Sequence, residues 1–305
     1  MFTNYFSHTC YRAFIHSQTL RTVLLLWALF VVSSPACAAK VLILGDMKYP
    51  FVANVANDIR STLKTEVNDY SIGEVKGQLN TIVERENAQV VVALGVDAVA
   101  EALRLPPDIS VVYGLVVTPP RSSRTNLTGV YMSPPVSEYL STVRRYFPAM
   151  GTISVIGSPA MVKSLGGGAN TQVTSYQVNS SSDLVNTVGR LGASNALILL
   201  PDVNLLTTSA MENLYAFSFR RNIPLLGISE GNVKQGALFA LVFDAKTISW
   251  QIGEKVQNIL NGYDAGEIPS SPPGKYNLFL NTNTARKMGL KVPDELLRKA
   301  RRVYQ

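Results

Sequence analysis

Polar residues follow the strong apolar runs of this 305-residue sequence, in short loops where a buried strand would give way to a helix. In an open α/β sheet, the loops beyond the carboxyl ends of the strands carry the contacts to a bound molecule. Aspartate, serine and asparagine there can accept or donate hydrogen bonds, and tyrosine adds a flat apolar face. The candidate contact residues in these loops are Asp46, Tyr49, Gly95, Val96, Asp97, Tyr113, Gly114, Ser158, Asp202, Asn204, Ser229 and Glu230.

Each of these residues also has a purely structural interpretation, as a helix cap, a turn residue or a packed strand end. Asp97 shows the choice most clearly, because it stands where the run VVVALG turns into the helical pattern VDAVAEAL. If Asp97 caps that helix, an anionic group must bind elsewhere, and the loop GSPAMV at Ser158 is the best candidate. If Asp97 points into a binding cleft, it favours a cationic or neutral group.

Histidine and cysteine chemistry is confined to the start of the chain, where His8, His16, Cys10 and Cys37 lie. Beyond residue 37 the sequence therefore excludes catalytic triads, thiolate nucleophiles and His- or Cys-ligated metals. No phosphate loop and no GxGxxG follows the first strand. An acid-base pair of Asp46 and Asp202 stays open as an enzymatic alternative. We expect a non-enzyme without cofactor or metal.

The first 38 residues have the pattern of an export signal. Arg12 and Arg21 precede the apolar run TVLLLWALFVV, and small residues follow Pro35, with cleavage expected after Ala38. A lipid anchor on Cys37 is the less favoured alternative, because Ser34 stands where a lipoprotein signal usually has an aliphatic residue. An uncleaved membrane anchor also stays open, although the run is short of the roughly 20 residues that span a bilayer. We expect a periplasmic protein.

Strand and helix patterns alternate from Lys40 onward, which is typical of parallel sheets covered by helices on both faces. Strands are expected at 40–45, 88–95, 108–115, 152–158, 171–178, 195–201, 223–229, 237–243 and 276–281, and helices at 52–63, 136–147, 182–191 and 204–221. The formal net charge is +7, but the basic residues are scattered, which argues against a nucleic-acid partner.

Two blocks of this pattern, separated by Pro- and Ser-rich passages, predict two Rossmann-like α/β lobes with parallel sheets, joined by a hinge of several strands. The expected bounds are 39–130 for the first lobe, completed by about 242–268, and 131–241 for the second, completed by about 269–305.

The C-terminal third carries a "GAL" turn, an aspartate before a helix ending ILNG, an "IP" crossing and the tail LN..TA..MGL.VP.ELL..A. Upstream, NLTGVYM and LILLPDVNLL fit the same pattern. These motifs resemble those of periplasmic ABC-transporter substrate-binding proteins, a family that includes aromatic-amino-acid binders and has the type I periplasmic-binding-protein fold. The resemblance implies capture of a small ligand between two lobes, hinge closure and delivery to an ABC permease, with no chemistry.

The loops themselves indicate a small polar or aromatic ligand, and we expect the protein to be a monomer. The alternative is a ligand-sensing or accessory protein of the same fold, which would work with a sensor or an outer-membrane receptor.

Overall fold

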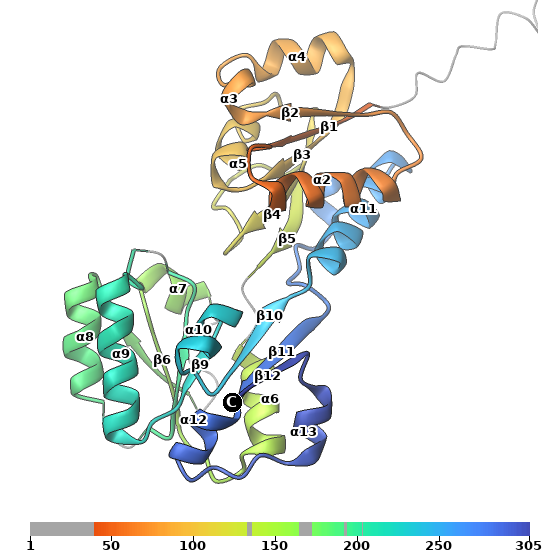
Figure 1. The fold of residues 1–305 in the computed structure, drawn as a ribbon. Helices are drawn as coiled ribbons and strands as arrows, with labels where there is room; N and C mark the ends of the chain where they lie inside the picture. Colours follow the sequence, from red (N-terminus) through yellow and green to blue (C-terminus); the bar gives the residue numbers. More distant parts are fainter. Residues whose placement is uncertain (1–39, 133–135, 165–172, 192–193, 203) are drawn as a thin grey trace, which may run out of the picture. The chain divides into compact units, whose positions relative to one another are not determined.

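The computed structural model describes residues 40–132, 136–164, 173–191, 194–202 and 204–305 (Figure 1). The expected export signal, its cleavage after Ala38 and the alternative anchor at Cys37 lie outside the described residues. Residues 1–39 form one unit and residues 40–305 form another.

The first sheet has five parallel strands in the order β2-β1-β3-β4-β5 (Figure 1). Its strands are β1 (Lys40–Gly45), β2 (Val67–Ser71), β3 (Ala88–Leu94), β4 (Ser110–Val116) and β5 (Leu127–Tyr131). Its helices are α2 (Pro50–Thr62), α3 (Ile72–Val75), α4 (Leu79–Glu86), α5 (Val96–Ala102), α11 (Ala245–Leu260) and the 3-10 turn η1 (Ala265–Glu267). Alternate residues of β1 enter two separate cores, Leu42 and Leu44 on one face and Val41 and Ile43 on the other. Helices therefore cover both faces of this sheet.

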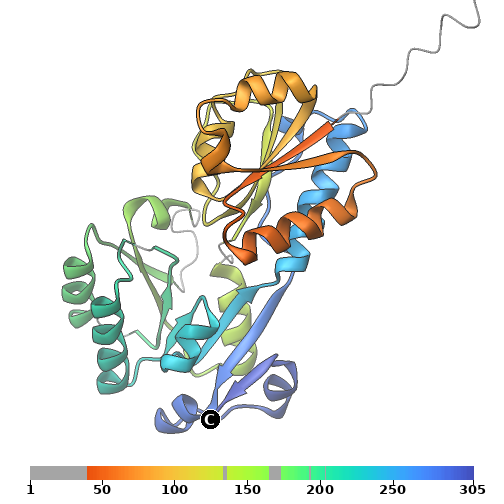
Figure 2. The ribbon, with the colours of Figure 1, turned by 45° about the horizontal axis from the view of Figure 1, so that its top comes forward.

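Helices α2 and α11, nearly two hundred residues apart in sequence, lie side by side on one face of the first sheet (Figures 1 and 2). Pro50 begins α2, at a position where the missing N–H costs no intrahelical bond. Asp244 caps α11 by accepting from the Thr247 backbone N–H at 3.0 Å. The two helices touch where Gly253 meets Thr62, and a Cβ on Gly253 would lie 1.9 Å from the Thr62 Oγ1. A segment late in the chain thus completes the first lobe.

The second sheet has seven strands in the order β12-β11-β10-β9-β8-β6-β7. Its strands are β6 (Ile153–Gly157), β7 (Val173–Gln177), β8 (Ala196–Leu199), β9 (Leu225–Gly227), β10 (Phe239–Phe243), β11 (Tyr276–Asn281) and β12 (Arg302–Tyr304). Its helices are α6 (Val136–Tyr146), α7 (Pro159–Ser164), α8 (Ser181–Gly189), α9 (Thr208–Arg221), α10 (Glu230–Gln235), α12 (Thr282–Lys287) and α13 (Asp294–Lys299). The pairings are parallel except that of β10 with β11, which is antiparallel.

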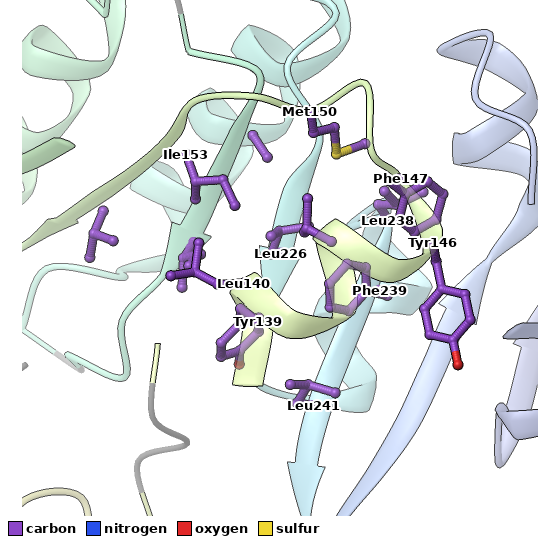
Figure 3. Packing of buried hydrophobic residues seen from close by; sticks show 14 of the residues in the cluster. Tyr139, Leu140, Tyr146, Phe147, Met150, Ile153, Leu226, Leu238, Phe239 and Leu241 are labelled. Carbon is purple, nitrogen blue, oxygen red and sulfur yellow. The ribbon is translucent and has the colours of Figure 1, made fainter. Parts of the chain in front are cut away.

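The core of the second lobe is built around α6 and the central strands (Figure 3). Tyr139 and Phe239 stack with ring centroids 6.1 Å apart, and Phe147 stacks on Phe239 at 6.3 Å. The Tyr139 hydroxyl donates to the Gly227 carbonyl at 2.9 Å, which satisfies a fully buried polar group. This bond fixes the end of β9, where one of the candidate loops begins.

The predicted fold class is confirmed: two α/β lobes with essentially parallel sheets. The chain passes between them three times, from β5 to α6, from β10 to α11 and from η1 to β11. Each of the nine expected strands is present. The sequence prediction missed β2, β12 and the short helices α3 and α4, because their residues are largely half-buried or exposed and lack an apolar period.

Candidate functional site

The candidate loops of the first lobe begin next to one another at the carboxyl edge of the sheet. Gly45, which ends β1, pairs with Leu94 of β3, and Leu94 pairs with Gly114 of β4. The Gly95 backbone N–H donates to the Gly114 carbonyl at 2.9 Å, which ties the turn after β3 to the neighbouring strand. We call Asp46 to Tyr49 together with Gly95 to Asp97 the first-lobe edge.

Side chains of the first-lobe edge are available to solvent. Tyr49 is 63% exposed and Val96 is 71% exposed, which is unusual for large apolar groups at a strand end. Asp97 is exposed, and Asp46 is half-buried with its Oδ1 accepting from the Lys48 backbone N–H at 3.3 Å. This edge therefore offers two carboxylates flanked by two apolar surfaces.

Asp97 does not cap its helix. The N-cap of α5 is Gly95, at φ 96°, which L side chains rarely adopt, and no side-chain hydrogen bond caps the helix. Asp97 is the second residue of α5 and its charge stabilises the helix N-terminus without occupying a backbone N–H. The carboxylate thus keeps its hydrogen-bonding capacity for another group.

Tyr113 and Gly114 have packing roles in this structure. Tyr113 is 1% exposed within the first core, and a Cβ on Gly129 would lie 2.5 Å from its ring. Burial raises the pKa of the Tyr113 hydroxyl. A Cβ on Gly114 would lie 2.5 Å from the Ile252 Cδ1, so the glycine allows α11 to approach β4. We therefore leave Tyr113 out of the contact set proposed below, and treat Gly114 as the support of the Gly95 turn.

The candidate loops of the second lobe follow the neighbouring strands β6, β8 and β9. Ser158 is half-buried directly after β6, and its carbonyl accepts from the Val162 backbone N–H at 2.9 Å. Asp202 follows β8 and its Oδ1 accepts from the backbone N–H of the exposed Asn204 at 3.2 Å. We call Ser158, Asp202, Asn204, Ser229 and Glu230 the second-lobe edge.

Ser229 and Glu230 are held by other parts of the second lobe. The Ser229 hydroxyl accepts from the Asn232 backbone N–H at 3.1 Å, and the Asn232 side chain accepts in return from the Ser229 N–H, forming a capping box. Glu230 accepts hydrogen bonds from the Tyr304 hydroxyl and from Arg302 Nη1, the latter at 2.8 Å. The Tyr304 hydrogen bond is the main cause that lowers the pKa of Glu230.

Sequence reasoning missed the residues that organise the second-lobe edge. Asn232 also accepts from the Ile228 N–H at 3.0 Å, and the apolar pattern of the loop gives no hint of this. The C-terminal residues Arg302 and Tyr304 reach Glu230 because β12 joins the sheet, a strand that the sequence did not predict. Tyr276, at the start of β11, has a hydroxyl without a hydrogen-bond partner among the described residues, and burial raises its pKa.

Two kinds of site are not found in the part of the chain that the structure describes. Its His, Cys, Asp and Glu side chains form no group of three that could hold a metal ion. No described helix combines the length and the apolar character needed to cross a bilayer.

A family model described as "ABC transporter substrate binding protein" matches residues 108–304, which is more than half of the chain. The chain belongs to this family. A curated relative, the tyrosine-binding protein of Clostridioides difficile strain R20291, is 23% identical over 121 residues. That alignment covers 40% of this chain and 35% of the relative, so the chain matches only about a third of its length.

Solved structures share the fold along most of the chain. The ligand-free, open form of a Clostridium difficile substrate-binding protein with adhesive properties has a TM-score of 0.64 at 16% identity, covering 88% of this chain and 99% of that one. A Streptococcus pneumoniae ABC domain in complex with L-Trp has a TM-score of 0.56 at 16% identity, covering 87% and 99%. A conserved domain protein of Vibrio cholerae has a TM-score of 0.57 at 19% identity, covering 87% and 99%.

Membership places the chain among extracytoplasmic binding proteins that work with ABC permeases, a class of proteins without enzymatic activity. The resemblance stated from the sequence is confirmed, as is the type I periplasmic-binding fold.

Proposed function

We propose that this protein is the solute-binding component of an ABC importer and that its ligand is an aromatic amino acid or a similar small amphipathic solute. The observation that carries the ligand class is the first-lobe edge, where two carboxylates lie between two exposed apolar side chains. An ammonium group requires acceptors of negative charge, and an aromatic ring requires an apolar face to stack on. Both requirements are met within one edge.

The proposed division of contacts follows from the chemistry of each residue. Asp46 and Asp97 accept from the ligand ammonium, while Tyr49 and Val96 cover the ring. On the second-lobe edge the Ser158 hydroxyl donates to the ligand carboxylate, because Asp202 and Glu230 would repel that charge. Asn204 and the Ser229 hydroxyl, which is free to donate, line the same edge as secondary contacts. Printed names of relatives that bind tyrosine or tryptophan support this ligand class.

The rest of the proposal concerns the setting in which the protein works. The signal peptide ends at residue 38, and the mature protein is a periplasmic monomer that delivers its ligand to an ABC permease. The two lobes have the bounds given from the sequence and close on the ligand by motion at the three connecting segments.

Thermal unfolding of the purified protein against amino acids, nucleosides, sugars, polyamines and vitamins tests this function. The protein should first be unfolded and refolded to remove a ligand that copurifies. A ligand present at a hundred times its dissociation constant adds about 2.7 kcal/mol to the free energy of unfolding, which gives a clear rise in Tm. We expect L-tyrosine or L-tryptophan to give this rise in the wild type and a smaller one in Tyr49→Ala.

The matched control is Tyr263→Ala, since Tyr263 is also 63% exposed but lies outside both edges. Its rise in Tm should equal that of the wild type. A panel in which no small molecule raises Tm would contradict the proposal and favour a role that depends on a protein partner.

A further inference from the structure

A hollow of about 920 Å³ lies at the amino-terminal edge of the first sheet, at the opposite strand ends from the first-lobe edge. It is lined by the starts of β3 and β4, by the segment 106–109, by α4 and by the turn that follows α11. Its volume is within the range of roughly 300–1,000 Å³ that small-molecule sites occupy. The proposed function makes no use of this region.

The charges of the hollow have one sign although the protein as a whole is basic. Three carboxylates line it, those of Glu84, Asp108 and Asp264, and no Lys, Arg or His is among its lining residues. The formal net charge of the chain is +7, so this lining is the reverse of the average surface. Arg124 lies behind it and offsets part of the Asp108 charge, while its guanidinium donates to the Leu105 carbonyl at 2.5 Å. The hollow is therefore suited to a cation.

A buried polar group in the lining lacks a partner. Asn126 is 9% exposed, and its Nδ2 donates to the carbonyls of Pro107 and Ile109. This arrangement fixes the amide so that Oδ1 is the remaining acceptor, and Oδ1 has no hydrogen-bond partner among the described residues. An unpaired buried acceptor costs free energy that a hydrogen-bond donor would recover.

The spacing of the acidic groups argues for an organic cation over a metal ion. The three carboxylates do not form a group that could hold a metal, by the same search of the described residues. Tyr263 is 63% exposed and lines the hollow, so its ring is available to an alkylammonium group. Glu84 already accepts from Asn80 at 2.8 Å and Asp264 from the Gly266 N–H at 2.8 Å, which holds both carboxylates in place.

We propose that this hollow binds a linear di- or polyamine, whose ammonium groups pair with the separated carboxylates of Glu84, Asp108 and Asp264 while its alkyl chain lies along Tyr263. The site is independent of the ligand that the two lobes capture. Binding here would make the protein sensitive to polyamine concentration without competition at the first-lobe edge.

Calorimetric titration of spermidine into the purified protein at low ionic strength tests the proposal. The variant E84Q/D108N/D264N keeps the shape and hydrogen bonding of each side chain and removes the charges. We expect it to bind spermidine about tenfold more weakly than the wild type, from the loss of three charge-assisted contacts. Tyr263→Ala should weaken binding by a smaller factor, about threefold.

The control variant E74Q/E212Q/E254Q removes the same charge from three exposed glutamates outside the hollow. It should bind spermidine as the wild type does, and E84Q/D108N/D264N should bind L-tyrosine as the wild type does. Equal weakening in the control would overturn the proposal in favour of nonspecific attraction. Loss of spermidine binding in D46N/D97N, with the hollow variant unaffected, would overturn it in favour of the first-lobe edge. No measurable spermidine binding by the wild type would also overturn it.

Discussion

The two edges differ in how their side chains are used. On the first-lobe edge, Gly95 forms the turn through its backbone, and Asp97 and Tyr49 remain exposed. On the second-lobe edge, Ser229 and Glu230 are bound by Asn232, Arg302 and Tyr304. The first edge therefore has side chains available to recognise a ligand, whereas much of the second maintains its own loop. Sequence alone presents both edges as equivalent rows of polar residues.

Removing Asn232 should have the largest effect, because it acts on the edge that is held by internal bonds. Asn232→Ala removes an acceptor for the N–H groups of Ile228 and Ser229 and half of the capping box. We expect the free energy of unfolding to fall by about 2 kcal/mol. Urea unfolding measures it.

Asn204→Ala is the matched control, since Asn204 is exposed in the same edge and only its backbone N–H takes part in a hydrogen bond. Its effect should be within about 0.5 kcal/mol. Equal losses in the two variants would contradict the view that Asn232 organises this edge.

Glu230 should give a smaller, pH-dependent effect. Its pKa is lowered in the folded protein, chiefly by the Tyr304 hydroxyl, so its stabilising contribution is complete above the unfolded pKa of about 4.3 and is lost as pH falls through the folded pKa. The Tm difference between wild type and Glu230→Gln should therefore shrink as the pH falls below about 4. Thermal scans across the acid range measure it.

Tyr304→Phe removes the main cause of that pKa shift and should reduce the pH dependence of the difference. A difference between wild type and Glu230→Gln that is constant across the acid range would contradict the role of Glu230 in holding the C-terminal strand.

The fold could be predicted from the sequence because its central strands are continuous apolar runs, as in AQVVVAL and ALIL, and its long helices have a clear apolar stripe. Edge strand β2 was missed because VNDYS is half-buried throughout and carries polar residues. Strand β12 was missed because three residues after a helix carry no recognisable period.

The candidate site could be predicted only as a set of loops. The rule that ligands bind beyond parallel strands selects the loops, but it does not say which side chain is free. That depends on partners distant in sequence, such as Tyr304 for Glu230. Tyr113 shows the limit on the other side, because a tyrosine at a strand end can equally face the core, where it is 1% exposed.

The most direct test of the account is calorimetric titration of L-tyrosine and L-tryptophan into wild type, D46N/D97N and D202N/E230Q. The two variants lose equal charge from opposite edges. The account predicts that the wild type binds at least one of the two amino acids, that D46N/D97N binds it about tenfold more weakly, and that D202N/E230Q changes the affinity less than about threefold. Absence of binding by the wild type, or a larger loss from D202N/E230Q than from D46N/D97N, would contradict it.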